Sequence, residues 1–253
     1  MELQSLVERF AEGFAVVDVE GALESFNQRT GEAYLPGLKT LKERSAVHAV
    51  DAWWPTAHPG DFNPRSAHFV EVSYPGLARA RCDFVVTTDG ELAHEWAVEV
   101  KNVALVGNNG KNNDFCVPKV LSPYLKDRSL MHDILRLRQY PVARRQAVLG
   151  YAFEYSLETC TQALERHPQH AEFIGNIRSV CKTNDPVGGR LPIEPLIDFA
   201  DEIFRSRRLV VGPVCQAAFE AWRHPCGGYG RVFAWEVAPR SATAPNDGAS
   251  ALW

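Results

Sequence analysis

The chain has 253 residues, of which 45% are hydrophobic and 23% are charged, and its formal net charge is −4. This composition is typical of a folded chain with a sizeable core, and the weak negative charge gives no global signature of nucleic-acid binding. No apolar run is long enough to span a bilayer, so we expect no membrane partner. The amino-terminal segment lacks the basic start and apolar block of a signal peptide, so a cytoplasmic location is expected. The six scattered cysteines are then expected to be reduced thiols.

The first part of the chain is predicted to be helical. Apolar residues recur at helical spacing through residues 1–27. A second helix is expected over residues 30–44, with Thr30 as its N-cap and an interruption at Pro36. Residues 51–66 are rich in Pro, Asp and Asn and indicate a loop.

Strands are predicted next. Residues 68–74 have strand character, and residues 81–102 are interpreted as two strands joined by a tight turn around Asp89 and Gly90. Further along, a loop enters a helix over residues 118–139, and an apolar strand follows over residues 145–155.

The carboxyl-terminal part is predicted to contain three more helices, over residues 156–167, 170–182 and 193–208. Residues 209–238 can form a hairpin, although 216–222 also fit a helix. This order of elements predicts an α/β (mixed α+β) fold in which helices flank a central mixed sheet. We expect one domain over residues 1–240, with its core at about 30–155, a C-terminal elaboration over 156–240 and a disordered tail over 241–253.

The most informative stretch is 81–102, where charged residues lie on predicted strands. Side chains alternate along a strand, so Glu99 and Lys101 point to one face and Val100 points to the other. An antiparallel return places Asp83 opposite or diagonal to Glu99, within reach of a common ion. Carboxylate and carbonyl oxygens suit Mg²⁺, so Asp83, Glu99 and the Val100 carbonyl are candidate metal ligands. Lys101 is a candidate to orient or deprotonate a water, or to stabilise charge on a phosphate. A salt-bridged sheet face is the structural alternative.

Asp83, followed after fifteen residues by Glu99-Val100-Lys101 on an apolar strand, resembles the PD-(D/E)xK nuclease superfamily. The flanking order of elements is similar too, over about residues 30–155, although Cys82 stands where the family pattern has proline. The resemblance implies a restriction-endonuclease-like core and a Mg²⁺-dependent DNA endonuclease, with Mn²⁺ as a second usable ion. It implies phosphodiester hydrolysis in restriction, defence or DNA repair, with Asp83, Glu99 and Lys101 as catalytic residues. A homodimer that cuts both strands is a further implication.

The resembled family often adds an acid from the first core helix. Glu32 is the best match as a further metal ligand, and Glu20 and Glu24 are alternatives. Glu71 and Glu95 are weaker candidates. A structural role for Glu32, in which it favours the dipole of a helix, stays open.

Local positive charge is concentrated between Lys126 and Arg145, where six basic residues face two acidic ones. In the resembled fold, the helix after the third strand lies beside the site. Contacts with DNA phosphates are therefore expected from Lys119, Ser122, Tyr124, Lys126 and Arg128. The alternatives to a nuclease are a non-catalytic DNA-binding protein on the same fold and a metal-dependent hydrolase of small phosphoesters.

Overall fold

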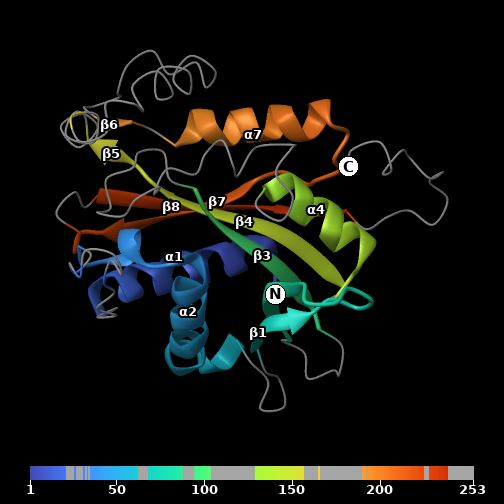
Figure 1. Ribbon diagram of the computed structural model, residues 1–253, viewed down its shortest axis with the longest axis horizontal. Coiled ribbons are helices and arrows are strands. Elements are labelled where there is room, and N and C mark those ends of the chain that lie inside the picture. Colours follow the sequence, from blue (N-terminus) through green and yellow to red (C-terminus); the bar gives the residue numbers. More distant parts are fainter. Residues whose placement is uncertain are drawn as a thin grey trace.

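The computed structural model describes residues 1–20, 26, 31, 33, 35–61, 68–87, 94–103, 129–156, 165, 190–191, 193–224 and 228–238. Within these ranges, a six-stranded mixed sheet lies between helices on both of its faces (Figure 1). The expectation of a mixed sheet flanked by helices is therefore confirmed. Among the described helices, none combines the length and the apolar character needed to cross a membrane.

The sheet has the strand order β1-β2-β3-β4-β8-β7. Its strands are β1 (His68–Ser73), β2 (Arg81–Val86), β3 (Trp96–Val103), β4 (Arg145–Phe153), β7 (Cys215–Ala221) and β8 (Gly228–Glu236). β3 and β4 are parallel, whereas every other neighbouring pair is antiparallel. A separate pair joins β5 (Tyr155–Ser156) to β6 (Arg190–Leu191). The parallel pair lies at the centre of the sheet, where strands are buried on both faces and need continuous apolar runs.

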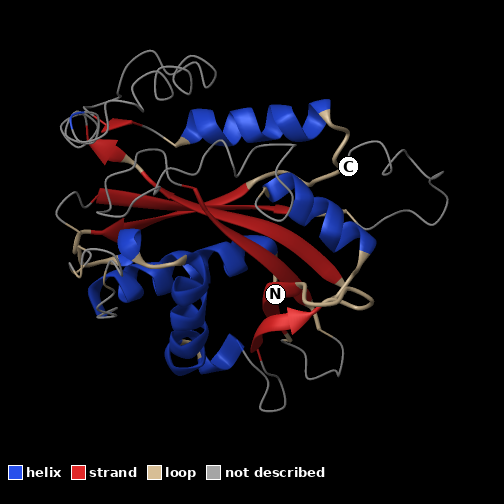
Figure 2. Ribbon diagram, viewed as in Figure 1, coloured by secondary structure: helices blue, strands red, loops and turns tan. Residues whose placement is uncertain are grey.

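Helices cover both faces of the sheet (Figure 2). One face carries α1 (Leu3–Glu20) and α2 (Glu43–Ala57), and the other carries α4 (Leu130–Gln139) and α7 (Glu194–Ser206). Short 3-10 turns, η1 (Leu38–Thr40) and η2 (Pro59–Asp61), lie on either side of α2. α4 begins at a true cap, because the Ser129 side chain accepts a hydrogen bond of 3.1 Å from the Met131 amide.

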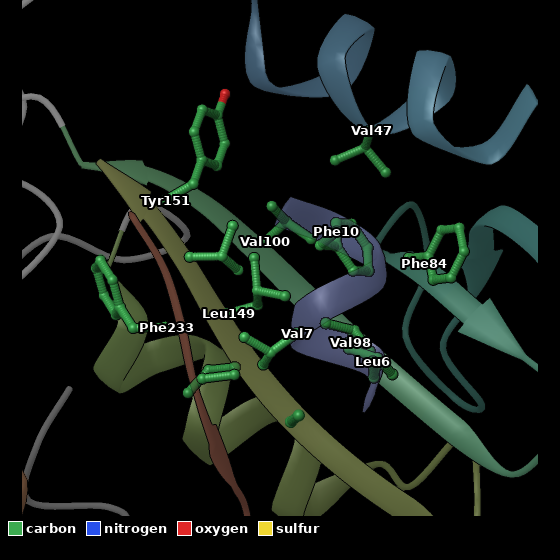
Figure 3. Packing of buried hydrophobic residues seen from close by; sticks show 14 of the residues in the cluster. Leu6, Val7, Phe10, Val47, Phe84, Val98, Val100, Leu149, Tyr151 and Phe233 are labelled. Carbon is green, nitrogen blue, oxygen red and sulfur yellow. The ribbon is translucent and has the colours of Figure 1, made fainter. Parts of the chain in front are cut away.

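The main core lies between the sheet and the α1–α2 face (Figure 3). Phe10 of α1 contacts the ring of Phe84 on β2 at 5.2 Å between centroids, and Phe14 contacts Tyr151 on β4 at 4.5 Å. Each such side chain contributes about 1.5–3 kcal/mol when it is fully buried. Val100 is fully buried on this face, as the strand alternation predicts. The charged residues on either side of it therefore point to the α4 face.

Two predictions in the amino-terminal part are wrong. A helix over residues 30–44 is not formed in its described part, because Gly37 has φ 102° and η1 follows it. The helix instead starts at Glu43 and continues to Ala57, through much of the segment that was predicted to be a loop. Pro55 lies inside the last turn of this helix, and the buried Ala46, Val47, Val50 and Trp54 form its apolar face.

In the carboxyl-terminal part, the structure decides between the strand and the helix that were both possible for residues 216–222. Residues 215–221 are a strand rather than a helix, and β7 and β8 form a hairpin that extends the main sheet beyond β4. Three further predictions lie outside the described residues. They are the turn at Asp89–Gly90, the helices over 156–167 and 170–182 (except residues 156 and 165, which are described), and the tail over 241–253.

Candidate functional site

The site begins where β2 and β3 stop pairing. Their register runs from Val86 opposite Trp96 to Phe84 opposite Val98, so the next position sets Asp83 against Glu99. There the Asp83 Oδ2 accepts a hydrogen bond of 2.8 Å from the Val100 amide. A side chain thus replaces the backbone ladder at this point, and it fixes Asp83 between the two charged residues of β3.

Glu99 is held from two sides. Its Oε1 accepts hydrogen bonds from the Tyr74 hydroxyl at 2.5 Å and from the Arg136 Nη2 at 2.9 Å. The side chain is only 1% exposed. Burial raises the pKa of Glu99 well above its ordinary value, and the neighbouring carboxylates of Asp133 and Asp83 raise it further. Glu99 is therefore a positioned, desolvated carboxyl group rather than a surface charge.

The Lys101 ammonium lies among oxygen atoms. Its Nζ is 3.1 Å from the Val100 carbonyl oxygen, 3.2 Å from Asp133 Oδ2, 3.4 Å from Glu43 Oε1 and 3.9 Å from Asp83 Oδ2. Burial lowers the pKa of Lys101, but the carboxylates of Asp133, Glu43 and Asp83 outweigh this, so the pKa is raised. Lys101 is consequently a protonated cation in this arrangement. As a cation it can stabilise negative charge or orient a water.

Two acids of this site were missed from the sequence. Glu43 is the first residue of α2, and its Oε2 accepts a hydrogen bond of 2.7 Å from the Asn102 amide. Burial raises the pKa of Glu43. Asp133 is fully buried on α4, and its Oδ1 lies 2.5 Å from Nη2 of Arg136. The spacing of Asp133 and Arg136 was the available signal, because residues three apart share one helix face.

The error in the start of α2 hid Glu43. An acid from a helix before the sheet was expected at Glu32, which lies outside the described residues, as does Glu24. Glu20 is exposed at the end of α1. Glu71 and Glu95 are engaged elsewhere: Glu71 pairs with Arg44, and Glu95 pairs with the Met1 α-ammonium.

The structure does not describe the residues that were expected to contact DNA. Lys119, Ser122, Tyr124, Lys126 and Arg128 all lie outside the described residues. Two other basic residues of the same segment are engaged in ion pairs. Arg136 is bound to Glu99, and Arg145 pairs with Glu236 at 2.8 Å while lying over the Trp96 ring. Part of the positive charge in this segment is therefore neutralised within the fold.

We call Lys101 and the five charged residues around it the acid cluster: Glu43, Asp83, Glu99, Lys101, Asp133 and Arg136. Its four carboxyl groups and two cations give it a surplus of two negative charges when all are ionised. Oxygen donors with this surplus fit a hard divalent cation. Within the described ranges, however, no three His, Cys, Asp or Glu side chains are grouped so as to hold a metal ion. The Lys101 ammonium lies between the carboxylates instead.

Comparison with known proteins assigns no role to these residues. No family model, no curated protein and no solved structure matches the chain.

Proposed function

We propose that the chain is a Mg²⁺-dependent DNA endonuclease of the PD-(D/E)xK type, which hydrolyses phosphodiester bonds at the acid cluster. The observation that supports this most directly is the position of the Lys101 ammonium, within 4 Å of the carboxylates of Glu43, Asp83 and Asp133. Carboxylates can hold a divalent cation, and that cation and a lysine ammonium can neutralise charge on an attacked phosphate, which is chemistry suited to phosphodiester hydrolysis. A homodimer belongs to the same proposal and is checked by sedimentation.

The residues divide into an open and a closed side. Glu43 and Asp83 have side chains that are 31% and 30% exposed, and with the Val100 carbonyl they would hold the cation. Glu99, Asp133 and Arg136 form the closed side and keep the strand and α4 in place. A Mg²⁺ ion held by these groups would supply an activated water and neutralise charge on the phosphate. Lys101 would donate hydrogen bonds to that water or to a phosphate oxygen.

A cleavage assay on supercoiled plasmid with Mg²⁺ tests the proposal. Lys101→Ala and Asp83→Ala should each lower the cutting rate by about 100-fold or more, since single charged groups at such sites contribute roughly 3 kcal/mol. Asp198→Ala, an exposed acid on α7, is the matched control and should cut at the wild-type rate. Unchanged cutting by both site variants would refute the assignment.

A second candidate is a non-catalytic DNA-binding protein. It is favoured by the way in which the cluster is closed by its own cations, with Arg136 on Glu99 and Lys101 on three other carboxylates. Calorimetric titration with Mg²⁺ and Mn²⁺ separates the two functions. Metal binding that is lost in Asp83→Asn and Glu43→Gln supports the nuclease, whereas DNA binding without any metal binding supports the second candidate.

A further inference from the structure

Two short basic stretches border the open side of the acid cluster. Lys42 and Arg44 flank Glu43 at the start of α2, and both are exposed. Arg79 and Arg81 stand at the end of the turn that joins β1 to β2, and both are exposed as well. Lys42 and Arg44 are thus adjacent to Glu43, and Arg81 and Arg79 are two and four residues before Asp83, which are the two carboxylates of the open side. We call Lys42, Arg44, Arg79 and Arg81 the basic rim.

Glu71 on β1 brings the two stretches together. The Arg44 guanidinium forms an ion pair with the Glu71 carboxylate. The Arg81 Nη1 donates hydrogen bonds to the Glu71 carbonyl oxygen at 3.0 Å and to the Ser73 hydroxyl at 3.2 Å. Arg44 and Arg81 come from separate elements, yet both contact one residue, so their guanidinium groups lie on one continuous surface.

The charge balance of this surface is opposite to that of the whole chain. The four exposed cations are accompanied by Glu71, whose side chain is 30% exposed, and by Glu43 and Asp83 of the adjoining open side, so cations still outnumber acids here in a chain of net charge −4. The Arg44 side chain is 70% exposed, so its ion pair with Glu71 leaves most of the guanidinium accessible to solvent. Such a local concentration of positive charge attracts a polyanion even when the protein as a whole is acidic.

We propose that the basic rim binds the phosphodiester backbone of a nucleic-acid strand and directs it to the acid cluster. The inference rests on the proposed function and adds the surface that holds the substrate. Several cations on two neighbouring elements match a chain of regularly spaced phosphates, whereas a small phosphoester offers a single charged group. Arginine suits this role because its planar group donates two parallel hydrogen bonds to phosphate oxygens.

The rim is tested by the binding of a fluorescein-labelled DNA duplex, measured by fluorescence anisotropy in Ca²⁺ at several salt concentrations. The double variant Arg44→Gln, Arg81→Gln should bind about 10- to 100-fold more weakly, with a salt slope lower by about 2. The matched control is Arg205→Gln, Arg207→Gln, which removes the same charge from exposed positions at the end of α7. It should keep wild-type affinity. An equal loss in both double variants, or no loss in the rim variant, overturns the proposal.

A variant that is expected to bind the duplex more tightly provides an independent check. Glu71→Gln removes the carboxylate that pairs with Arg44 and should strengthen duplex binding several-fold, because the Arg44 guanidinium then has no carboxylate partner to compete with phosphate. Weaker binding by Glu71→Gln would contradict the rim. Equally tight and equally rim-dependent binding of polyglutamate would also contradict it, since the surface would then take any polyanion.

The failure of the rim and the failure of the nuclease assignment give different results. If the wild type binds and cuts DNA and the rim variants do both equally well, the nuclease stands and the rim is wrong. If the wild type binds DNA through the rim and does not cut it with Mg²⁺, the rim stands and the nuclease is wrong. If the wild type binds no duplex, both proposals are refuted.

Discussion

Two buried carboxylates, Asp18 and Glu99, have the same burial and very different surroundings. Asp18 near the end of α1 is fully buried, and its two oxygens accept hydrogen bonds from the amides of Leu38 at 2.8 Å and Arg223 at 2.9 Å. Both donors belong to the backbone, and they come from segments far apart in the chain. Asp18 therefore clips three segments together, and both of its oxygens are occupied by the fold itself.

Glu99 differs because its partners are side chains and its neighbours are other acids. Tyr74 and Arg136 hold it, while Asp83 and Asp133 lie close enough to raise its pKa. Both oxygens of the isolated acid accept hydrogen bonds from backbone amides. The clustered acids, by contrast, carry more negative charge than their neighbouring cations balance. The comparison shows that burial alone does not separate a structural acid from a candidate site. The balance of charge around the acid does.

Removing the guanidinium from the cluster should have the largest effect on this balance. Arg136→Met removes the cation that pairs with the buried Glu99 and Asp133, and should lower the free energy of unfolding by about 3 kcal/mol. Arg205→Met is the control, because Arg205 pairs with Asp201 on an exposed helix face and is 78% exposed. It should change stability by less than about 1 kcal/mol. Similar losses in urea denaturation of the two variants would contradict the distinction.

Removing the two hydrogen bonds of Asp18 should have the second-largest effect on stability. Asp18→Ala leaves one buried and one partly buried amide without an acceptor and should lower the free energy of unfolding by about 2 kcal/mol. Asp18→Asn keeps one acceptor oxygen and should lose about half as much. Duplex binding should be unchanged in both variants, since Asp18 lies outside the acid cluster. A change in binding that exceeds the change in stability would refute a purely structural role.

The third effect concerns the pH dependence of stability. The folded-state pKa of Glu99 lies above its ordinary value of 4.5, so the folded protein retains a proton that the unfolded chain has released. Stability is therefore greatest below this window and falls as pH rises through it, by at most about 1.4 kcal/mol per pH unit for one proton. Glu99→Gln should flatten this decline between pH 5 and 8 in EDTA, as followed by urea denaturation at each pH. An unchanged slope would show that Glu99 does not retain the proton.

The sequence predicted the strands around the site better than the helices. Alternation along 81–102 gave the correct faces for Glu99, Val100 and Lys101, because the period of a strand is set locally. The start of α2 was missed because the region around Pro36 and Gly37 was interpreted as an interruption of a helix rather than as a turn before one.

The remaining members of the cluster depend on tertiary contacts. Asp133 and Arg136 were visible only as ordinary charges on an amphipathic helix, and nothing local indicated that α4 turns them toward β3. Glu43 reaches Lys101 from a helix that packs largely on the opposite face of the sheet. Such contacts follow from the packing of whole elements, so pattern analysis of single segments does not find them.

The position of β4 in the sheet bears on how the chain is made. β4 ends at Phe153, but its second neighbour, β8, begins only at Gly228. During synthesis, β3 and β4 therefore emerge well before the strand that completes the sheet. Until β8 arrives, β4 presents an apolar, unpaired edge, which is the kind of surface that promotes association between nascent chains. Ribosome-bound chains that stop before Cys215 should consequently depend on chaperones more than the full chain does.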